Sequence, residues 1–320
     1  MKAAVIHAFG EIPQYREFPD PVPLENEVLV EVKASVLENF DKLTVAGTHY
    51  SSRQLFPQFP AIPGTDGVGR NLEGKLVAFG NVRPPYGAFA EKVVAGYALP
   101  VPEGIDPADA AAILPSVLTS LLPLKYAAKL LPGETVLVNG ATGVSGRIAV
   151  QVAKMLGAGK VVGTGRNKRS LALLSKLGAD ETISLDQPEE QLAEAFIRGN
   201  EGRGYDVVVD FLWGRPAEIL ISTFIPQEAG FAKRRIRYIQ IGEKAGAHVS
   251  LPGSALRTSG LELMGVGQVP QQALSEEIAA VWEGIGTGKF YMEIEKVPLS
   301  GIADAWQQDD LQGKRLVVVP

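Results

Sequence analysis

Three evenly spaced glycines, Gly140, Gly143 and Gly146, restrict the fold of this chain more than any other feature of its sequence. They lie in VLVNGATGVSGRIAV (residues 136–150), where an apolar strand pattern changes to a helical one. The first glycine permits a tight turn after the strand, the second lets backbone N–H groups approach a pyrophosphate, and the third lets the helix pack closely. This spacing predicts a dinucleotide-binding turn; the alternative is a glycine-rich connection that binds nothing.

The helical pattern that follows, over residues 146–157, has an apolar and a polar stripe. The polar stripe contains Arg147 and is predicted to face outward. Gly157 is a reasonable end for this helix. The apolar stripe, predicted to face a sheet, is formed by Ile148, Val152, Met155 and Leu156.

The chain of 320 residues is long enough for about two domains, and its texture changes twice. Residues 1–115 contain short strand-like runs between Pro- and Gly-rich stretches. From Ser116, strand patterns alternate with helical ones, which is typical of a parallel sheet covered on both faces. We therefore expect an α/β protein in which a doubly wound Rossmann sheet (116–268) is inserted in a β-rich barrel domain (1–115 and 269–320).

Composition excludes several classes of function. The net charge of −5 argues against a nucleic-acid partner. The longest apolar run is interrupted by Pro115 and Pro123, and the N-terminus lacks the apolar core of a signal peptide, so we expect a cytoplasmic protein with no membrane segment. The absence of cysteine excludes thiolate chemistry, and His7, His49 and His248 lack a paired ligand spacing, so no metal site is predicted.

The residues after the second strand of the predicted sheet indicate which dinucleotide binds. An acidic residue about 20 positions beyond the glycine turn would bind the 2′-hydroxyl of NAD. This chain instead has Gly165, Arg166, Asn167, Lys168 and Arg169 there. Guanidinium and ammonium groups suit a 2′-phosphate, so the sequence favours NADP(H). The alternative is a solvated helix start whose charges face water.

Taken in order, a series of segments resembles the medium-chain dehydrogenase/reductase superfamily and, within it, the zinc-free quinone oxidoreductase branch. These segments span nearly the whole chain: ASVLENFDKLTVAGTHY, FPAIPGTDGVG, YGAFAEKVV, LPSVLTSLLPL, LLPGETVLVNGATGVSG, KLGADETI, IQIG, VPLSGIADAW and GKRLVVV. Zinc-dependent members carry an early cysteine and a Gly-His-Glu; here those regions read ENFD and PGTD. The resemblance implies a GroES-like catalytic domain around the Rossmann domain, an active site in the cleft, and a homodimer formed along the strand LELMGV.

The resemblance also implies which side chains meet the substrate. Asn39, Asp41 and Tyr50 are expected on the substrate side of the cleft, although the Asn-x-x-Asp spacing of the family is shortened here. Tyr50 is expected to contact substrate and to donate a hydrogen bond or a proton to the developing oxyanion. For Asn39 and Asp41 the alternative is turn-forming hydrogen bonding.

Further cofactor contacts follow from position. By resemblance, Thr119 lies near the nicotinamide; the alternative is a mid-helix threonine bonded to its own backbone. The carboxyl ends of later strands should also face the cofactor. Trp213 is interpreted as a packed core residue. The candidate cofactor-binding residues are Thr119, Gly140, Thr142, Gly143, Val144, Gly146, Gly165, Arg166, Asn167, Lys168, Arg169, Phe211, Leu212, Ile241, Gly242, Val266 and Gly267.

These observations predict hydride transfer from NADPH to a small electrophilic acceptor, a quinone or a conjugated enone, without zinc. The protein would position the nicotinamide, shape the pocket and exclude water. One alternative is an enoyl or alkenal double-bond reductase. Another, from a different class, is a cofactor-binding protein with little turnover, because a fold does not fix a function.

Overall fold

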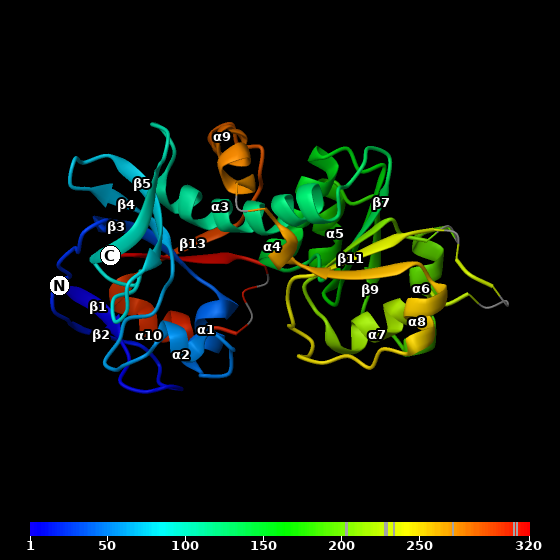
Figure 1. The fold of residues 1–320 in the computed structure, drawn as a ribbon, viewed down its shortest axis with the longest axis horizontal. Helices are drawn as coiled ribbons and strands as arrows, with labels where there is room; N and C mark the ends of the chain where they lie inside the picture. Colours follow the sequence, from blue (N-terminus) through cyan, green and yellow to red (C-terminus); the bar gives the residue numbers. More distant parts are fainter. Residues whose placement is uncertain (202–203, 227–229, 233, 271, 310, 312) are drawn as a thin grey trace. The chain divides into compact units, whose positions relative to one another are not determined.

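The computed structural model describes residues 1–201, 204–226, 230–232, 234–270, 272–309, 311 and 313–320. The chain divides into two compact units (Figure 1). The first, the barrel unit, comprises Met1–Pro115 and Trp282–Pro320; the second, the Rossmann unit, comprises Ser116–Val281. The expected domain limits of 1–115, 116–268 and 269–320 stay a prediction. The second boundary between the two compact units lies 13 residues later than expected, within the helix Ala273–Gly286.

The Rossmann unit contains a parallel sheet of six strands in the order β12-β11-β10-β7-β8-β9. The chain moves outward from β7 to β9 and then returns to place β10 beside β7, so the direction of winding reverses between these two strands. This strand order confirms the doubly wound Rossmann sheet and puts the topological switch point between β7 and β10. The strands are β7 (Thr135–Asn139), β8 (Lys160–Gly165), β9 (Glu181–Ser184), β10 (Val207–Asp210), β11 (Ile236–Gln240) and β12 (Leu261–Gly265).

Helices connect the parallel strands, as a parallel sheet requires. The central strands are buried along their whole length, in accord with their continuous apolar runs. Phe196 and Tyr238 are among the largest fully buried side chains of this core. The helices of the unit are α4 (Val144–Met155), α5 (Lys168–Lys176), α6 (Glu189–Gly199), α7 (Gly214–Ser222) and α8 (Gly253–Thr258), with the short helical turns η1 (Pro123–Ala127) and η2 (Val266–Gln268).

The barrel unit is built on four antiparallel strands that close on themselves, because β3 pairs with both β4 and β6. The C-terminal strand β14 pairs with β3, so both ends of the chain contribute to this unit, as predicted. Its strands are β3 (Val28–Leu37), β4 (Gly67–Asn71), β5 (Leu76–Val82), β6 (Lys92–Pro100), β13 (Ile294–Pro298) and β14 (Arg315–Val319), with a separate hairpin of β1 (Lys2–Val5) and β2 (Gln14–Glu17).

The remaining helices include one with the length and apolar composition of a membrane span. This segment, Pro107–Ala127, has 67% of its most apolar window buried inside the structure, as core helices of globular proteins also do. The expected cytoplasmic location stays a prediction. These helices are α1 (Asn39–Val45), α2 (Ser52–Leu55), α3 (Pro107–Leu122), α9 (Ala273–Gly286) and α10 (Ile302–Trp306), with the 3-10 turn η3 (Leu299–Gly301).

Candidate functional site

The glycine turn lies at the carboxyl end of β7, beside the switch point. Gly140 has a φ of +87°, a conformation that favours glycine. A Cβ added to Gly146 would lie 2.3 Å from the Gly140 carbonyl oxygen, so only glycine permits this close approach of α4. A Cβ on Gly143 would meet nothing closer than that oxygen, at 3.7 Å. The turn therefore leaves free space beside Gly143, just before the first N–H groups of α4, which lack partners within their own helix.

The end of β8 packs against this turn. A Cβ on Gly165 would lie 2.3 Å from a methyl carbon of Thr142, so the glycine at this strand end lets the two segments touch. Beyond Gly165, the Asn167 side chain caps α5 by accepting a hydrogen bond of 3.0 Å from the Ser170 N–H. The sequence-predicted phosphate-binding segment thus begins directly beside the glycine turn.

The basic side chains of this segment, Arg166, Lys168 and Arg169, are exposed. The two nearest downstream acids have other partners: Asp180 accepts from the Val161 N–H and pairs with Lys154, and Glu181 pairs with Lys160. The carboxylates of the described residues form no ion pair with the three cations. This end of the sheet therefore presents uncompensated positive charge to a ligand.

Arg147 corrects one expectation. Its side chain was predicted to face outward, but the residue is only 5% exposed, and its Nε donates a hydrogen bond of 3.2 Å to the Thr142 carbonyl oxygen. Long side chains in a helix lean toward the helix N-terminus, and this one lies in the first turn of α4. The guanidinium therefore follows the glycine turn instead of extending into water.

A chain of buried polar side chains crosses the switch point, and the sequence analysis did not identify it. Thr164, Asn139, Asp210 and Tyr238 come from the adjacent strands β8, β7, β10 and β11, and all four are fully buried. We call them the switch-point network. Thr164, Asn139 and Asp210 end the apolar runs VVG, VLV and VVV, which is the signal that would have revealed them, whereas Tyr238 lies in a strand that also contains Arg237 and Gln240.

Asp210 also orders the turn between β10 and α7. Its carboxylate accepts hydrogen bonds from the backbone N–H of Leu212, at 2.9 Å, and of Trp213, at 3.2 Å. Trp213 has a φ of +53°, and its ring lies edge-on to Tyr238 with the ring centres 6.2 Å apart. Trp213 is therefore a partly buried packing residue of this core, as interpreted from the sequence.

Some candidate cofactor residues from different strand ends lie together in the structure. A Cβ on Gly140 would meet the Leu212 side chain at 3.0 Å, and one on Gly242 would meet the Phe211 carbonyl oxygen at 2.8 Å. Ile241 donates its N–H to the Asp210 carbonyl oxygen. In contrast, Gly267 lies in η2 with nothing within 4 Å of a Cβ, next to the exposed Val266.

The remaining candidates are only partly enclosed. Val144 is the first residue of α4, and Thr119 is half-buried within α3. The assignment of cofactor contacts to these residues stays a prediction.

The candidate catalytic residues lie around α1 of the barrel unit. Asp41 is 3% exposed, and its carboxylate accepts a 2.8 Å hydrogen bond from the Glu38 N–H at the start of that helix. This is the turn-forming bond considered as the alternative to catalysis. Asn39 is exposed, and Tyr50 is 95% exposed with its ring against His49, the ring centres being 4.1 Å apart. The catalytic roles of all three stay predictions.

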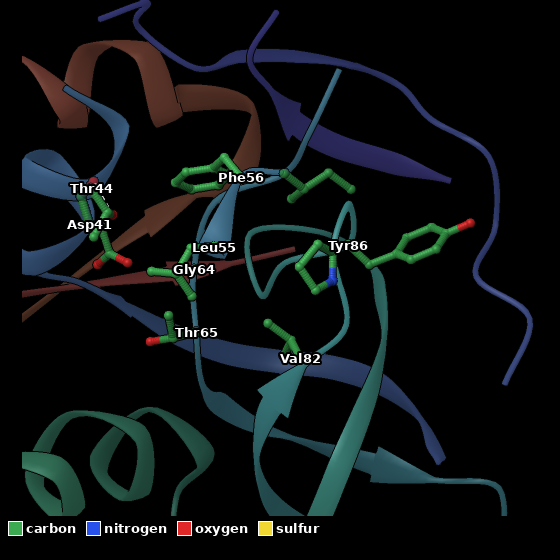
Figure 2. A pocket seen from close by; sticks show the side chains of 10 residues that line it. Asp41, Thr44, Leu55, Phe56, Gly64, Thr65, Val82 and Tyr86 are labelled. Carbon is green, nitrogen blue, oxygen red and sulfur yellow. Dashed lines mark hydrogen bonds between the residues drawn. The ribbon is translucent and has the colours of Figure 1, made fainter. Parts of the chain in front are cut away.

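Asp41 faces a small pocket within the barrel unit (Figure 2). The pocket has about 300 Å³ of empty space, part of it open to solvent. Asp41, Thr44 and Thr65 supply polar groups on one side, whereas Phe56 and Val82 supply apolar surface. It is a pocket with one polar end, lined by residues of α1, α2, the segment before β4, and the end of β5 with the segment that follows it.

Two carboxyl groups beside this pocket, the buried Asp41 and the partly buried Asp66, have raised pKa values. Burial raises the pKa of Asp41 well above its usual range, and the nearby charge of Glu38 raises it further. Burial and the same Glu38 charge raise the pKa of Asp66 to about 7. The Arg315 guanidinium, which donates to Glu38 at 2.6 Å, acts in the opposite direction on both. Within the part of the chain that the structure describes, no three metal-ligating side chains cluster.

The chain is similar to proteins described as quinone oxidoreductases. A family model for zinc-binding dehydrogenases matches residues 145–218. A probable NADPH-dependent quinone reductase of Emericella nidulans is 26% identical, with 100% of both chains covered. A chloroplast envelope quinone oxidoreductase homolog of Arabidopsis thaliana is 29% identical, with 92% of this chain and 89% of the relative covered. The solved quinone oxidoreductase of Thermus thermophilus, studied also in complex with NADPH, has a TM-score of 0.80 at 29% identity, with 100% of both chains covered.

Proposed function

We propose that this chain, which belongs to the medium-chain dehydrogenase/reductase superfamily in its quinone oxidoreductase-like branch, reduces a quinone or a conjugated carbonyl with NADPH. The observation that carries the proposal is the glycine turn at the switch point of the Rossmann sheet, where Gly143 faces free space and Gly146 admits the start of α4. Dinucleotides bind at this place in doubly wound sheets. The relatives named above as NADPH-dependent or NADPH-bound quinone reductases support the cofactor and the substrate class.

The residues present fit NADPH. The N–H groups at the start of α4 are donors for the pyrophosphate, and the partial positive charge of a helix N-terminus favours that anion. Arg166, Lys168 and Arg169 are exposed cations at the adjacent strand end, suited to the 2′-phosphate. When bound, NADPH supplies the hydride.

The barrel unit is expected to supply the substrate side. Tyr50, with its exposed hydroxyl, is the proposed donor of a hydrogen bond to the oxygen on which negative charge develops. Zinc independence is part of the proposal, because the chain has no cysteine and has Thr65 and Asp66 where zinc-dependent members have His and Glu. An acceptor that is already electrophilic needs no metal to polarise it.

The activity is tested by following the loss of reduced-nicotinamide absorbance with p-benzoquinone, phenanthrenequinone and an alkenal as acceptors. We expect oxidation of NADPH with the quinones, and an unchanged rate after dialysis against a chelator. NADPH binding without consumption above background for any acceptor would overturn the reductase proposal in favour of a binding protein. A rate abolished by the chelator and restored by zinc would overturn zinc independence.

Cofactor choice is tested by Arg166→Ala. We expect it to weaken NADPH binding by about 1–3 kcal/mol, the typical loss for a charged hydrogen bond, and to leave NADH binding nearly unchanged. Lys176→Ala, in the last turn of α5, the helix that begins two residues after Arg166, is also exposed and is the matched control. Equal losses for both nucleotides in Arg166→Ala would contradict the 2′-phosphate assignment.

A homodimer along β12 is a further part of the proposal. β12 is the outermost strand of the sheet, and its Leu263 is 36% exposed. An edge strand with apolar side chains is suited to pairing with a second copy. Light scattering is expected to give the mass of two chains, and a stable monomer at micromolar concentration would reject the dimer.

A further inference from the structure

The switch-point network joins the two turns that flank the switch point. On one side, the Gly140 N–H donates to Thr164 Oγ1 at 2.9 Å, and the Thr164 hydroxyl donates to Asn139 Oδ1 at 2.8 Å. The Asn139 amide then donates to Asp210 Oδ1 at 2.9 Å, across the switch point itself. The glycine turn is therefore connected to Asp210 by three successive hydrogen bonds.

On the other side, Asp210 accepts from the turn that begins α7 and from β11. The Leu212 N–H donates to Oδ1, and the Tyr238 hydroxyl donates to Oδ2 at 2.6 Å. The sheet register places Asp210 opposite Asn139 on β7 and opposite Gln240 on β11. The Asp210 carboxylate therefore holds the β10–α7 turn directly, and it holds the glycine turn through Asn139 and Thr164.

All the donors in this network point toward Asp210. Hydrogen bonds that run in one direction polarise each other, and burial strengthens them because the local dielectric constant is low. The hydrogen bonds from Tyr238, Leu212, Trp213 and Asn139 hold down the pKa of Asp210, against the larger effect of burial, which raises it. A change at either end is therefore expected to alter the bonds at the other end.

We propose that the Asn139–Asp210 pair positions the glycine turn and the β10–α7 turn as one unit, so that the two halves of a bound dinucleotide depend on each other. Asn139, Thr164, Asp210 and Tyr238 are positioning residues in this proposal, acting through the backbone of the two turns. The inference rests on the proposed binding of NADPH, and it adds that the two turns are coupled.

The test is a double-mutant cycle on NADPH affinity with Thr164→Val and Tyr238→Phe. Each substitution removes one hydroxyl and keeps nearly the same shape. The two residues are three strands apart, roughly 14 Å at about 4.8 Å per strand, a separation at which unconnected sites contribute additively. We expect each single variant to bind NADPH more weakly. The fold-loss of NADPH affinity in the double variant should differ from the product of the two single fold-losses by about 3-fold or more.

The matched control is Tyr205→Phe. Tyr205 is also fully buried in the Rossmann unit, but its hydroxyl donates to the Phe196 carbonyl oxygen at 2.8 Å, outside the network. When Tyr205→Phe is combined with Thr164→Val, the fold-loss of NADPH affinity is expected to equal the product of the two single fold-losses. Thr164→Ser, which keeps the hydroxyl, is expected to restore NADPH affinity, so the cycle stays readable if a valine variant proves unstable.

The outcomes separate this inference from the proposed function. Suppose that the unmodified protein binds NADPH, but the fold-loss of affinity in the double variant agrees within about 2-fold with the product of the Thr164→Val and Tyr238→Phe fold-losses. The coupling is then rejected and the cofactor proposal stands. If the unmodified protein does not bind NADPH, both are rejected. Adenosine 2′,5′-bisphosphate, which lacks the pyrophosphate and the nicotinamide, should bind all these variants equally; weakening of this probe would mean that the substitutions damage the whole unit.

Discussion

The two units bury carboxyl groups in contrasting surroundings. In the Rossmann unit, hydrogen-bond donors converge on Asp210, and each of these bonds acts against the rise in its pKa caused by burial. In the barrel unit, the charge of Glu38 adds to the effect of burial on Asp41 and Asp66. Asp210 is thus surrounded by donors, whereas Asp41 and the partly buried Asp66 lie near a like charge.

The surroundings of each carboxyl group indicate what it can do. A carboxylate that accepts several hydrogen bonds fixes the positions of its donors, and the donors of Asp210 include the backbone N–H groups of Leu212 and Trp213 in the β10–α7 turn. A carboxyl group with a raised pKa holds its proton to higher pH, so it links stability to pH. Asp210 is therefore expected to be essential to local structure, and Asp66 to be a source of pH dependence.

The largest effect that tests this comparison is expected from Asp210→Ala. The substitution leaves the buried amide of Asn139, the hydroxyl of Tyr238 and the Leu212 N–H without their acceptor. Each unsatisfied buried group costs about 1–3 kcal/mol, so we expect the free energy of unfolding to fall by about 3 kcal/mol or more. Urea unfolding followed by circular dichroism measures this change.

Asp180→Ala is the control for that measurement. The Asp180 carboxylate accepts from the Val161 N–H at 2.6 Å and pairs with Lys154, but its side chain is 42% exposed. Water can replace it as an acceptor, so we expect a loss of only about 1 kcal/mol. A loss in Asp210→Ala no greater than in Asp180→Ala would show that the convergence of donors on Asp210 contributes little.

A smaller effect of opposite sign is expected from Asp66→Asn. The pKa of Asp66 is about 7 in the folded protein, above the value near 4 of an unfolded chain. Between these values the folded state holds a proton that the unfolded state has released, so the free energy of unfolding falls as pH rises from about 4 to about 7. The asparagine variant lacks this penalty and should be more stable than the unmodified protein above pH 7.

We expect a gain on the order of 1–2 kcal/mol above pH 7, less than the pKa difference alone implies, because part of Asp66 is solvent-accessible. The gain should vanish near pH 4, which thermal unfolding at a series of pH values can check. Asp210→Asn should instead lose stability at every pH, because an amide N–H₂ cannot accept from its donors. A gain for both variants would remove the contrast between the two sites.

Much of the fold could be predicted from the sequence, because it follows from local patterns. Strand and helix patterns alternate from Ser116 onward. The glycine turn and the turn after α4, where Gly157 has a φ of +88°, both depend on glycine conformation. The pairing of β14 with β3 was expected only as a β-rich domain built from both ends of the chain, since no local pattern encodes a pairing of strands that lie almost 280 residues apart.

The rest depends on side-chain directions and strand register. Arg147 sits at an outward position by helical period, but its length lets it lie back along the glycine turn. The network between Thr164 and Tyr238 exists only because β8, β7, β10 and β11 become neighbours, and that order is not a periodicity of the sequence. Likewise, the family resemblance suggested Tyr50 as a substrate contact but could not indicate that this residue would be 95% exposed.

The smallest expected effect is a shift in pH dependence in Glu38→Gln. Removing this charge takes away a cause of the raised pKa of Asp66, and it also removes the negative charge of Glu38 that partly offsets Arg315, which lowers that pKa. Both changes favour ionised Asp66, so the pH at which stability falls should move below about 7, by roughly one unit or less. Glu73→Gln, which removes a surface partner of Lys75, should leave that pH unchanged. If thermal unfolding places the fall at the same pH in both variants, the charge of Glu38 has no effect on Asp66, and the like charge drops out of the contrast with Asp210.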